Sequence, residues 1–396
     1  MREIYLDNAA TTRVLPEVAE RMKQIYLEEY GNPSSLHHKG VEAERALVGA
    51  REIIAGTLKV APRTITFTSC GSESDNLAIL GAVRANRRRG RHLVTTNIEH
   101  PGVSQAMRYL EEEGFEITWL PVDNKGRVTP EQVAEAVRED TLLVSVMHVN
   151  NEIGAIEPVE AIGAAVKEKN PATLFHVDAV QSYTKLPLLP RRMHIDLLAI
   201  SGHKIHAPKG IAALYVAETA KIQPVLFGGG QQAGLRSGTE NVAGAAGMAL
   251  AAERLFRTAE EDREALYDKK QAFLDAIREI PDVRVNGLAP ESDGSFLRAE
   301  IEKTAPHIIS ISVKGVRAEV LLHALEDRGV YVSSGSACST HHRETKGTVD
   351  AIGVPAEYRE GTIRLSLSVF TTEEEIREGA AALRELIPEL RRFVRR

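Results

Sequence analysis

The chain has 396 residues, of which 43% are apolar and 26% are charged, the ordinary balance of a globular protein. Its net charge of −6, from 49 basic and 55 acidic residues, argues against direct nucleic-acid binding, and 2 cysteines are too few for a disulfide framework. The N-terminus has no apolar signal core, and no run of apolar residues is long enough to cross a membrane. We therefore expect a cytoplasmic enzyme.

Short apolar runs alternate with amphipathic segments in the first half of the chain. Such β-branched runs, separated by helical patterns, indicate βαβ units and a mainly parallel sheet covered on both faces. After Gly244 a long helical pattern extends toward Pro281, and the shorter strand and helix patterns beyond it predict a second, smaller α+β unit. The predicted buried strands lie at 64–69, 92–98, 142–149, 173–180, 196–201 and 212–216.

Two charged residues stand at the ends of predicted strands. Lys204 follows the strand at 196–201, where an unpaired buried ammonium is costly. A lysine in such a place suits a Schiff base with a carbonyl cofactor. Asp178 lies near the end of the strand at 173–180, where a carboxylate suits the protonated nitrogen of a pyridine ring. Taken singly, a surface lysine and a turn aspartate are the commoner interpretations.

Three more polar segments follow strands. The segment 67–76 runs from a strand into a Gly/Ser turn, where Ser72 and free backbone N–H groups form a cradle suited to phosphate. His100 is suited to stacking on a flat ring and moving protons, although a structural histidine is the default. Asn150 and Asn151 form either a turn or a binding amide. Because ligands of α/β folds bind at the carboxyl ends of strands, these groups together predict one site.

The sequence resembles the pyridoxal-phosphate-dependent cysteine desulfurases, in the class V aminotransferase branch of fold type I. The resemblance extends in order over nearly the whole chain, through YLDNAATT, GNPSSLHHKG, TSCGSESDN, EHPGV, MHVNNEIG, HVDAVQS, SGHKIHAPKG, GGGQQAGLRSGTEN, SSGSACS and IRLSLS. It implies a large α/β domain over 14–260 with a mainly parallel seven-stranded sheet. A small α+β domain, made of 1–13 and 261–396, would contain the catalytic cysteine loop at about 333–347.

The same resemblance implies a role for individual residues. Lys204 would bind pyridoxal 5′-phosphate covalently, Asp178 would pair with the ring nitrogen, Gln181 with the ring hydroxyl, and His100 would stack on the ring and carry protons. The substrate carboxylate would be bound by Asn151, which also borders the cofactor, and by Arg364, whose guanidinium suits a carboxylate. The phosphate would be held by Gly71, Ser72, Ser201 and His203, joined by Thr239 from the other subunit of a homodimer.

The two cysteines have different predicted roles. Cys338 lies among small polar residues typical of a mobile loop, and a partly exposed thiol there is suited to be a nucleophile. Cys70 lies at a strand-to-turn junction and is predicted to be a packed, inert thiol. The family more usually has glycine at that place, followed by Ala-Thr rather than Gly71-Ser72. After Cys338 the sequence THHRETKG also departs from the family pattern, which leaves the sulfur acceptor open.

The expected reaction converts L-cysteine to L-alanine and leaves a persulfide on Cys338. The sulfur would pass to an iron–sulfur scaffold protein, where Cys338 is a possible transient cluster ligand, or to a tRNA-thiolation enzyme; no resident metal is implied. A selenocysteine lyase would share every motif, whereas an ordinary aminotransferase would not need Cys338. A catalytically silent scaffold fits poorly with an intact Lys204, Asp178 and His100.

Overall fold

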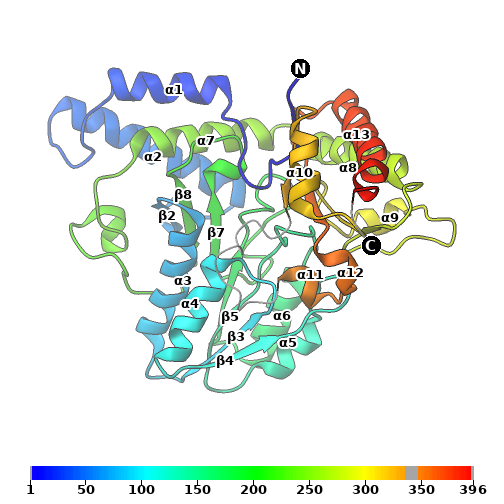
Figure 1. Ribbon diagram of the computed structural model, residues 1–396. Coiled ribbons are helices and arrows are strands. Elements are labelled where there is room, and N and C mark those ends of the chain that lie inside the picture. Colours follow the sequence, from blue (N-terminus) through cyan, green and yellow to red (C-terminus); the bar gives the residue numbers. More distant parts are fainter. Residues whose placement is uncertain (1, 335–346, 394–396) are drawn as a thin grey trace.

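The computed structural model describes residues 2–334 and 347–393. A seven-stranded sheet lies at the centre of its larger part, and neighbouring strands are parallel except β8, which is antiparallel to both β2 and β7 (Figure 1). The predicted α/β fold with a mainly parallel seven-stranded sheet is therefore confirmed. The order across the sheet is β2 (Ile65–Thr68), β8 (Ala212–Val216), β7 (Leu197–Ser201), β6 (Leu174–Asp178), β5 (Thr141–Ser145), β3 (His92–Thr96) and β4 (Glu116–Leu120).

Each predicted apolar run overlaps one of these strands, but the sequence analysis missed β4. This strand lies at the edge of the sheet, and its side chains are mostly exposed or half-buried, so it lacks the apolar run of a central strand. The runs predicted at 92–98, 142–149 and 173–180 also extend past the observed strand ends. Regular pairing stops at Thr96, Ser145 and Asp178, where the chain leaves the sheet.

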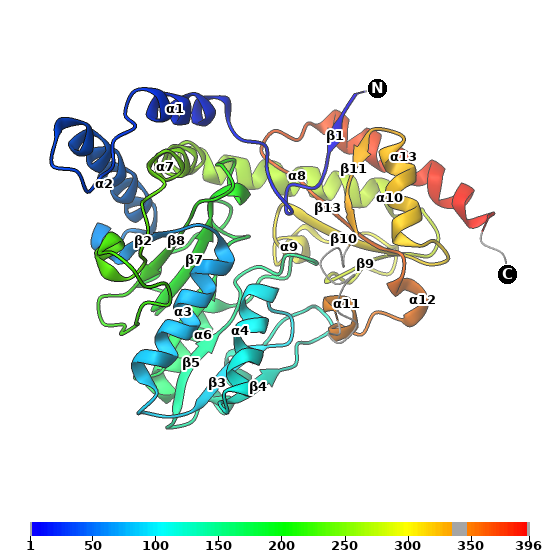
Figure 2. The ribbon, with the colours of Figure 1, turned by 60° about the vertical axis from the view of Figure 1, so that its left-hand side comes forward.

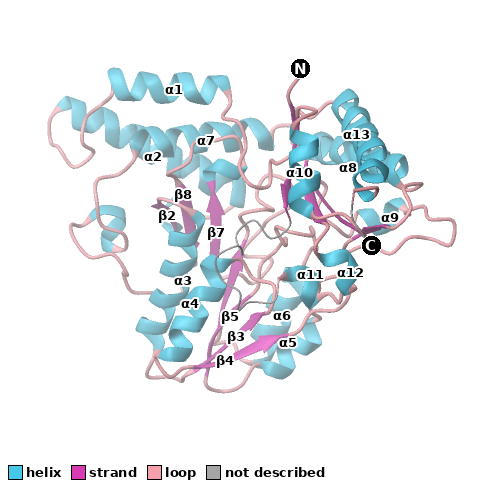
Figure 3. Ribbon diagram, viewed as in Figure 1, coloured by secondary structure: helices cyan, strands magenta, loops and turns pink. Residues whose placement is uncertain are grey.

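The central strands are buried because alternate residues enter two different apolar cores. Leu93, Leu143 and Leu197 pack with helices α3 (Gly71–Asn86) and α4 (Pro101–Glu112) on one face. Their neighbours Val94 and Val144 pack on the other face, so helices enclose the sheet on both sides (Figure 3). That second face is covered by α2 (His38–Leu58), α5 (Pro130–Ala136), α6 (Val159–Lys169) and α7 (Val242–Phe256), with α1 (Pro16–Leu27) packed on α7.

A second, smaller sheet lies beside the first and has its own apolar core. Its strands are antiparallel, and a short parallel pair of β1 (Ile4–Tyr5) and β11 (Val330–Tyr331) adjoins them. The order is β12 (Ser333–Ser334), β13 (Thr362–Ser366), β10 (Ile308–Val313) and β9 (Val283–Val285). The helices of this part are α8 (Ala259–Ile277), α9 (Arg298–Ile301), α10 (Ala318–Glu326), α11 (Thr348–Ala351), α12 (Ala356–Arg359) and α13 (Glu373–Arg391).

The N-terminal segment connects the two parts. It runs from β1, beside β11, past the end of β13 to α1 on the larger part (Figure 2). The single long helix predicted after Gly244 is instead two helices, α7 and α8, separated at Arg257 and Thr258. Leu255 belongs to the larger core and Leu266 to the smaller one, and the domain boundary at 260 stays a prediction. None of the helices in the described residues is long and apolar enough to cross a membrane.

Candidate active site

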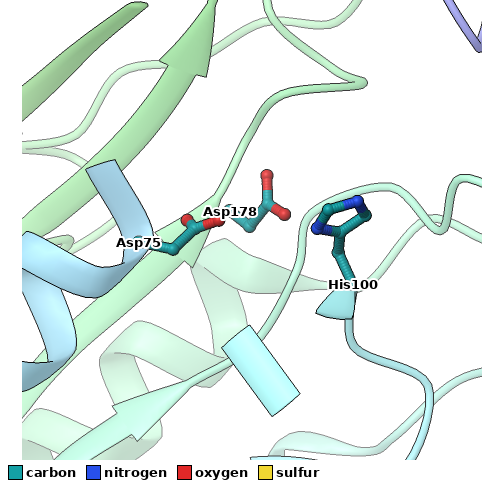
Figure 4. Close-up of side chains that lie close together, drawn as sticks. All are labelled: Asp75, His100 and Asp178. Carbon is teal, nitrogen blue, oxygen red and sulfur yellow. The ribbon is translucent and has the colours of Figure 1, made fainter. Parts of the chain in front are cut away.

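The polar residues predicted to form a site come together at the carboxyl ends of the large sheet. Asp178 is the last residue of β6, and His100 follows β3 as the residue before α4. One carboxylate oxygen each of Asp178 and of Asp75, which lies on α3, and one ring nitrogen of His100 all lie within 4.8 Å of one another (Figure 4). This cluster confirms that chain segments distant in sequence meet here, and it adds Asp75, which the sequence analysis did not single out.

Lys204 reaches this place from a short turn. It ends the 3-10 turn η2 (Gly202–Lys204), which begins directly after β7. The turn starts with glycine because a Cβ on Gly202 would lie only 2.8 Å from Ile211 Cγ2. The Lys204 ammonium donates hydrogen bonds to the carbonyl oxygens of Ala9 and Ala10, at 2.6 and 2.8 Å. The N-terminal segment therefore holds the lysine head group at the strand ends.

Two further residues fix the turn that carries the lysine. Thr12 donates its hydroxyl proton to the carbonyl oxygen of His203 at 2.9 Å and accepts the backbone N–H of His206 at 2.7 Å. Lys185 donates to the carbonyl oxygen of Lys204 at 3.0 Å. Burial and the charge of Lys204 lower the pKa of Lys185 to about 7. The sequence analysis assigned a role to neither residue.

Asp178 and His100 are electrostatically linked. Burial raises the pKa of Asp178, while His100, the backbone N–H of Val180 and Lys204 oppose that increase. Burial lowers the pKa of His100, and the negative charge of Asp178 opposes this shift. The backbone N–H of Gly102 donates to His100 Nδ1 at 3.0 Å. In the neutral ring the proton therefore sits on Nε2, which leaves that nitrogen as the donor.

The start of α3 provides an anion cradle. The helix begins at Gly71, and its N-cap residue, Cys70, makes no side-chain hydrogen bond to the first turn. The backbone N–H groups of that turn can therefore donate to a ligand. A Cβ on Gly71 would lie 2.9 Å from Val180 Cγ2, which explains the need for glycine. The Ser201 hydroxyl is buried and has no hydrogen-bond partner among the described residues, and the hydroxyl-bearing Ser72 is exposed.

His203 lies beside Lys204 and contacts Thr11, with 3.3 Å between Nδ1 and Oγ1. Burial and the positive charges of Lys204 and Lys209 lower the pKa of His203 to about 4. A buried hydroxyl without a partner among the described residues, the N–H groups at a helix start and an imidazole beside two lysines are complementary to phosphate. These residues therefore fit the phosphate group that the sequence predicted.

Gln181 and Arg364 approach the site from two sides. Gln181 donates to the carbonyl oxygen of Ala9 at 2.9 Å, and its side-chain oxygen faces His307 at 3.4 Å. Arg364 comes from β13 of the smaller sheet and donates to the carbonyl oxygen of Asn151 at 2.8 Å and to Asp7 at 2.9 Å. Its Nε is buried and has no partner among the described residues, so the guanidinium keeps a donor for a ligand.

Three predicted residues stand apart from this picture. Thr239 is exposed, in a segment tied to the start of α3 by the Arg236–Glu73 ion pair at 2.7 Å, and its contact with a second subunit stays a prediction. Cys338 and most of the predicted loop at 333–347 lie outside the described residues. Cys70 is exposed rather than packed, so that prediction was wrong: the residue lies past the end of β2 and before the first turn of α3, outside both elements.

Comparisons with known proteins agree on one family. The family model for class-V aminotransferases matches residues 4–378. A protein of Dictyoglomus turgidum named cysteine desulfurase IscS is 41% identical over 391 residues, which are 98% of this chain and 96% of that protein. A solved structure described as a NifS-like protein superposes with a TM-score of 0.90 at 36% identity, covering 98% of this chain and all of that one. Another, described as SspA in complex with cysteine, has a TM-score of 0.77 at 32% identity and covers 94% of this chain and all of that one.

Proposed function

The chain belongs to the class-V aminotransferase family, and we propose that it is a pyridoxal-phosphate-dependent cysteine desulfurase. It converts L-cysteine to L-alanine and keeps the sulfur as a persulfide on Cys338. The observation that supports this most directly is the meeting of an amine, a carboxylate and an imidazole at the strand ends. The charges of Lys204, Asp178 and His100 each act on the pKa of a neighbour in this group.

The residues present fit the cofactor. Pyridoxal phosphate, when bound, supplies a carbonyl for the Lys204 amine and an electron sink for the substrate carbanion. Asp178 would pair with its ring nitrogen, Gln181 with its hydroxyl, and His100 would stack on the ring, with Asn151 at the border of the cofactor site. The phosphate would be held by Gly71, Ser72, Ser201 and His203 of one subunit and by Thr239 of the other.

The chain itself performs the binding and proton steps. Arg364 and Asn151 bind the carboxylate of L-cysteine, and the Lys204 amine removes the proton from its α-carbon. The Cys338 thiolate attacks the substrate sulfur, so an S–S bond forms while the C–S bond breaks and its electron pair stays with the carbon skeleton. His100 returns protons through Nε2, and the skeleton leaves as L-alanine.

The remaining proposals concern partners and location. We propose a cytoplasmic homodimer, since Thr239 has its predicted role only toward a neighbour's phosphate. An active, cofactor-loaded monomer in sedimentation would contradict it. The sulfur acceptor is an iron–sulfur scaffold protein or a tRNA-thiolation enzyme, to which Cys338 would present the persulfide.

Incubating the purified protein with L-cysteine and measuring alanine and sulfide tests the proposal. We expect alanine from the parent chain and none above background from Cys338→Ser, with the cofactor absorbance present in both. Alanine formation that does not depend on Cys338 would contradict the proposal. A clear rate preference for selenocysteine over cysteine would instead indicate a selenocysteine lyase.

A further inference from the structure

Asp75 is a buried acid that the proposed reaction does not use. It lies on α3, and its side chain is 1% exposed. One of its carboxylate oxygens lies within 4.8 Å of a carboxylate oxygen of Asp178 and of a ring nitrogen of His100 (Figure 4). Its Oδ1 accepts no hydrogen bond among the described residues and lies 3.5 Å from Nε2 of His176. A carboxylate so enclosed needs either a positive partner or a proton.

The imidazole that lies against Asp75 Oδ1 does not supply a positive charge. His176 is fully buried, and burial lowers its pKa to about 3, so this ring is neutral near pH 7. Burial and the negative charges of the neighbouring acids raise the pKa of Asp75 well above its usual range. The titratable groups that face it are Asp178 and His176 of β6, Glu99 and His100 after β3, and Cys70 before α3.

Asp178 accepts a backbone hydrogen bond, whereas Asp75 Oδ1 accepts none from the described part of the chain. Asp178 Oδ1 accepts the backbone N–H of Val180 at 2.9 Å, and the charges of His100 and Lys204 favour its ionised form. Two carboxyl groups this close in a buried site do not both ionise at neutral pH. The negative charge therefore belongs on Asp178 and the proton on Asp75.

We propose that Asp75 is an uncharged carboxylic acid in the folded protein and a positioning residue that leaves Asp178 as the single charged carboxylate of the pair. The role toward Asp178 rests on the proposed function, because Asp178 then faces the ring nitrogen of the cofactor alone. The protonated state of Asp75 does not rest on it. The two ideas can therefore fail separately.

Proton linkage in the full chain without cofactor tests the protonated state. Asparagine is the isosteric, uncharged mimic, so the unfolding equilibrium of the parent chain and of Asp75→Asn is measured in urea from about pH 4 to 7. Where folding raises the pKa of a group, the folded protein becomes less stable as pH increases, because the group ionises more readily in the unfolded chain. We expect the unfolding equilibrium constant of the parent chain, relative to the variant, to rise up to tenfold per pH unit above about pH 4. A ratio that is constant or falls with pH would overturn the proposal.

A second measurement covers the case in which the variant does not fold. Carbon-13 NMR of the parent chain, labelled only at aspartate carboxyl groups, should show a protonated carboxyl at pH 7, and its absence would overturn the proposal. In the cofactor-loaded enzyme, the pH titration of the cofactor absorbance should be the same in Asp75→Asn as in the parent. A shift of about one pH unit or more would mean that a charge was removed, contrary to the role proposed toward Asp178.

Discussion

Replacing Arg364 with lysine tests how the substrate carboxylate is bound. Arg364 is 7% exposed, and two of its nitrogens are already fixed by Asp7 and the carbonyl oxygen of Asn151. Its buried Nε has no partner among the described residues, so we expect the carboxylate of L-cysteine to use this face of the guanidinium. Lysine keeps the positive charge but loses the planar pair of donors.

The expected magnitude follows from one lost charge-assisted hydrogen bond. Such a bond contributes about 1.5–3 kcal/mol, so kcat/KM for L-cysteine should fall about 10- to 150-fold in Arg364→Lys. Alanine in place of arginine would remove the charge and the hydrogen bonds to Asp7 and Asn151 as well, and its effect on kcat/KM should be larger. It would also leave the half-buried Asp7 without its ion pair, so lysine is the cleaner substitution.

Cysteamine, which is cysteine without its carboxylate, separates a binding role from a structural one. The parent and Arg364→Lys should differ strongly with L-cysteine and little with cysteamine as substrate. The matched control is Arg359→Lys, since Arg359 donates to the carbonyl oxygen of Val354 near the same sheet but is not part of the site. The reasoning would be refuted by an equal loss with both substrates, or by an unchanged kcat/KM for L-cysteine.

Three further predictions concern the amine, the thiol and the N-terminal segment. Lys204→Ala should abolish turnover. In the cofactor-loaded parent protein, borohydride reduction followed by peptide mapping should find the label on Lys204; a label on Lys209 would refute that assignment. Brief exposure to L-cysteine should add about 32 Da, one sulfur atom, to the peptide containing Cys338, and mass spectrometry that finds it only on the exposed Cys70 would overturn the proposed chemistry. Thr12→Val should lower the free energy of unfolding by about 2–4 kcal/mol, because it leaves a buried N–H unsatisfied and breaks a second hydrogen bond; a change within error in urea unfolding would contradict this.

The strands of the large sheet could be predicted from the sequence because they are buried on both faces. Such strands are continuous apolar runs, and each predicted run overlapped a strand. The edge strand Glu116–Leu120 has no such run, so the same reasoning missed it. The break between α7 and α8 was missed because both halves are helical and the interruption at Arg257 and Thr258 changes only the packing partner.

The sequence by itself determined which charged and polar groups stand at the strand ends. Asp178 ends a buried strand and Lys204 and His100 follow two others, and parallel strands bring their carboxyl ends to one edge whatever the details of packing. Tertiary structure alone decided which other groups reach that edge. Asp7 and Thr12 come from the N-terminal segment, so a pattern local to the strands does not identify them. The charge of Asp75 was likewise undetermined, because it depends on its distance from Asp178 and His176, and such distances exist only in the folded chain.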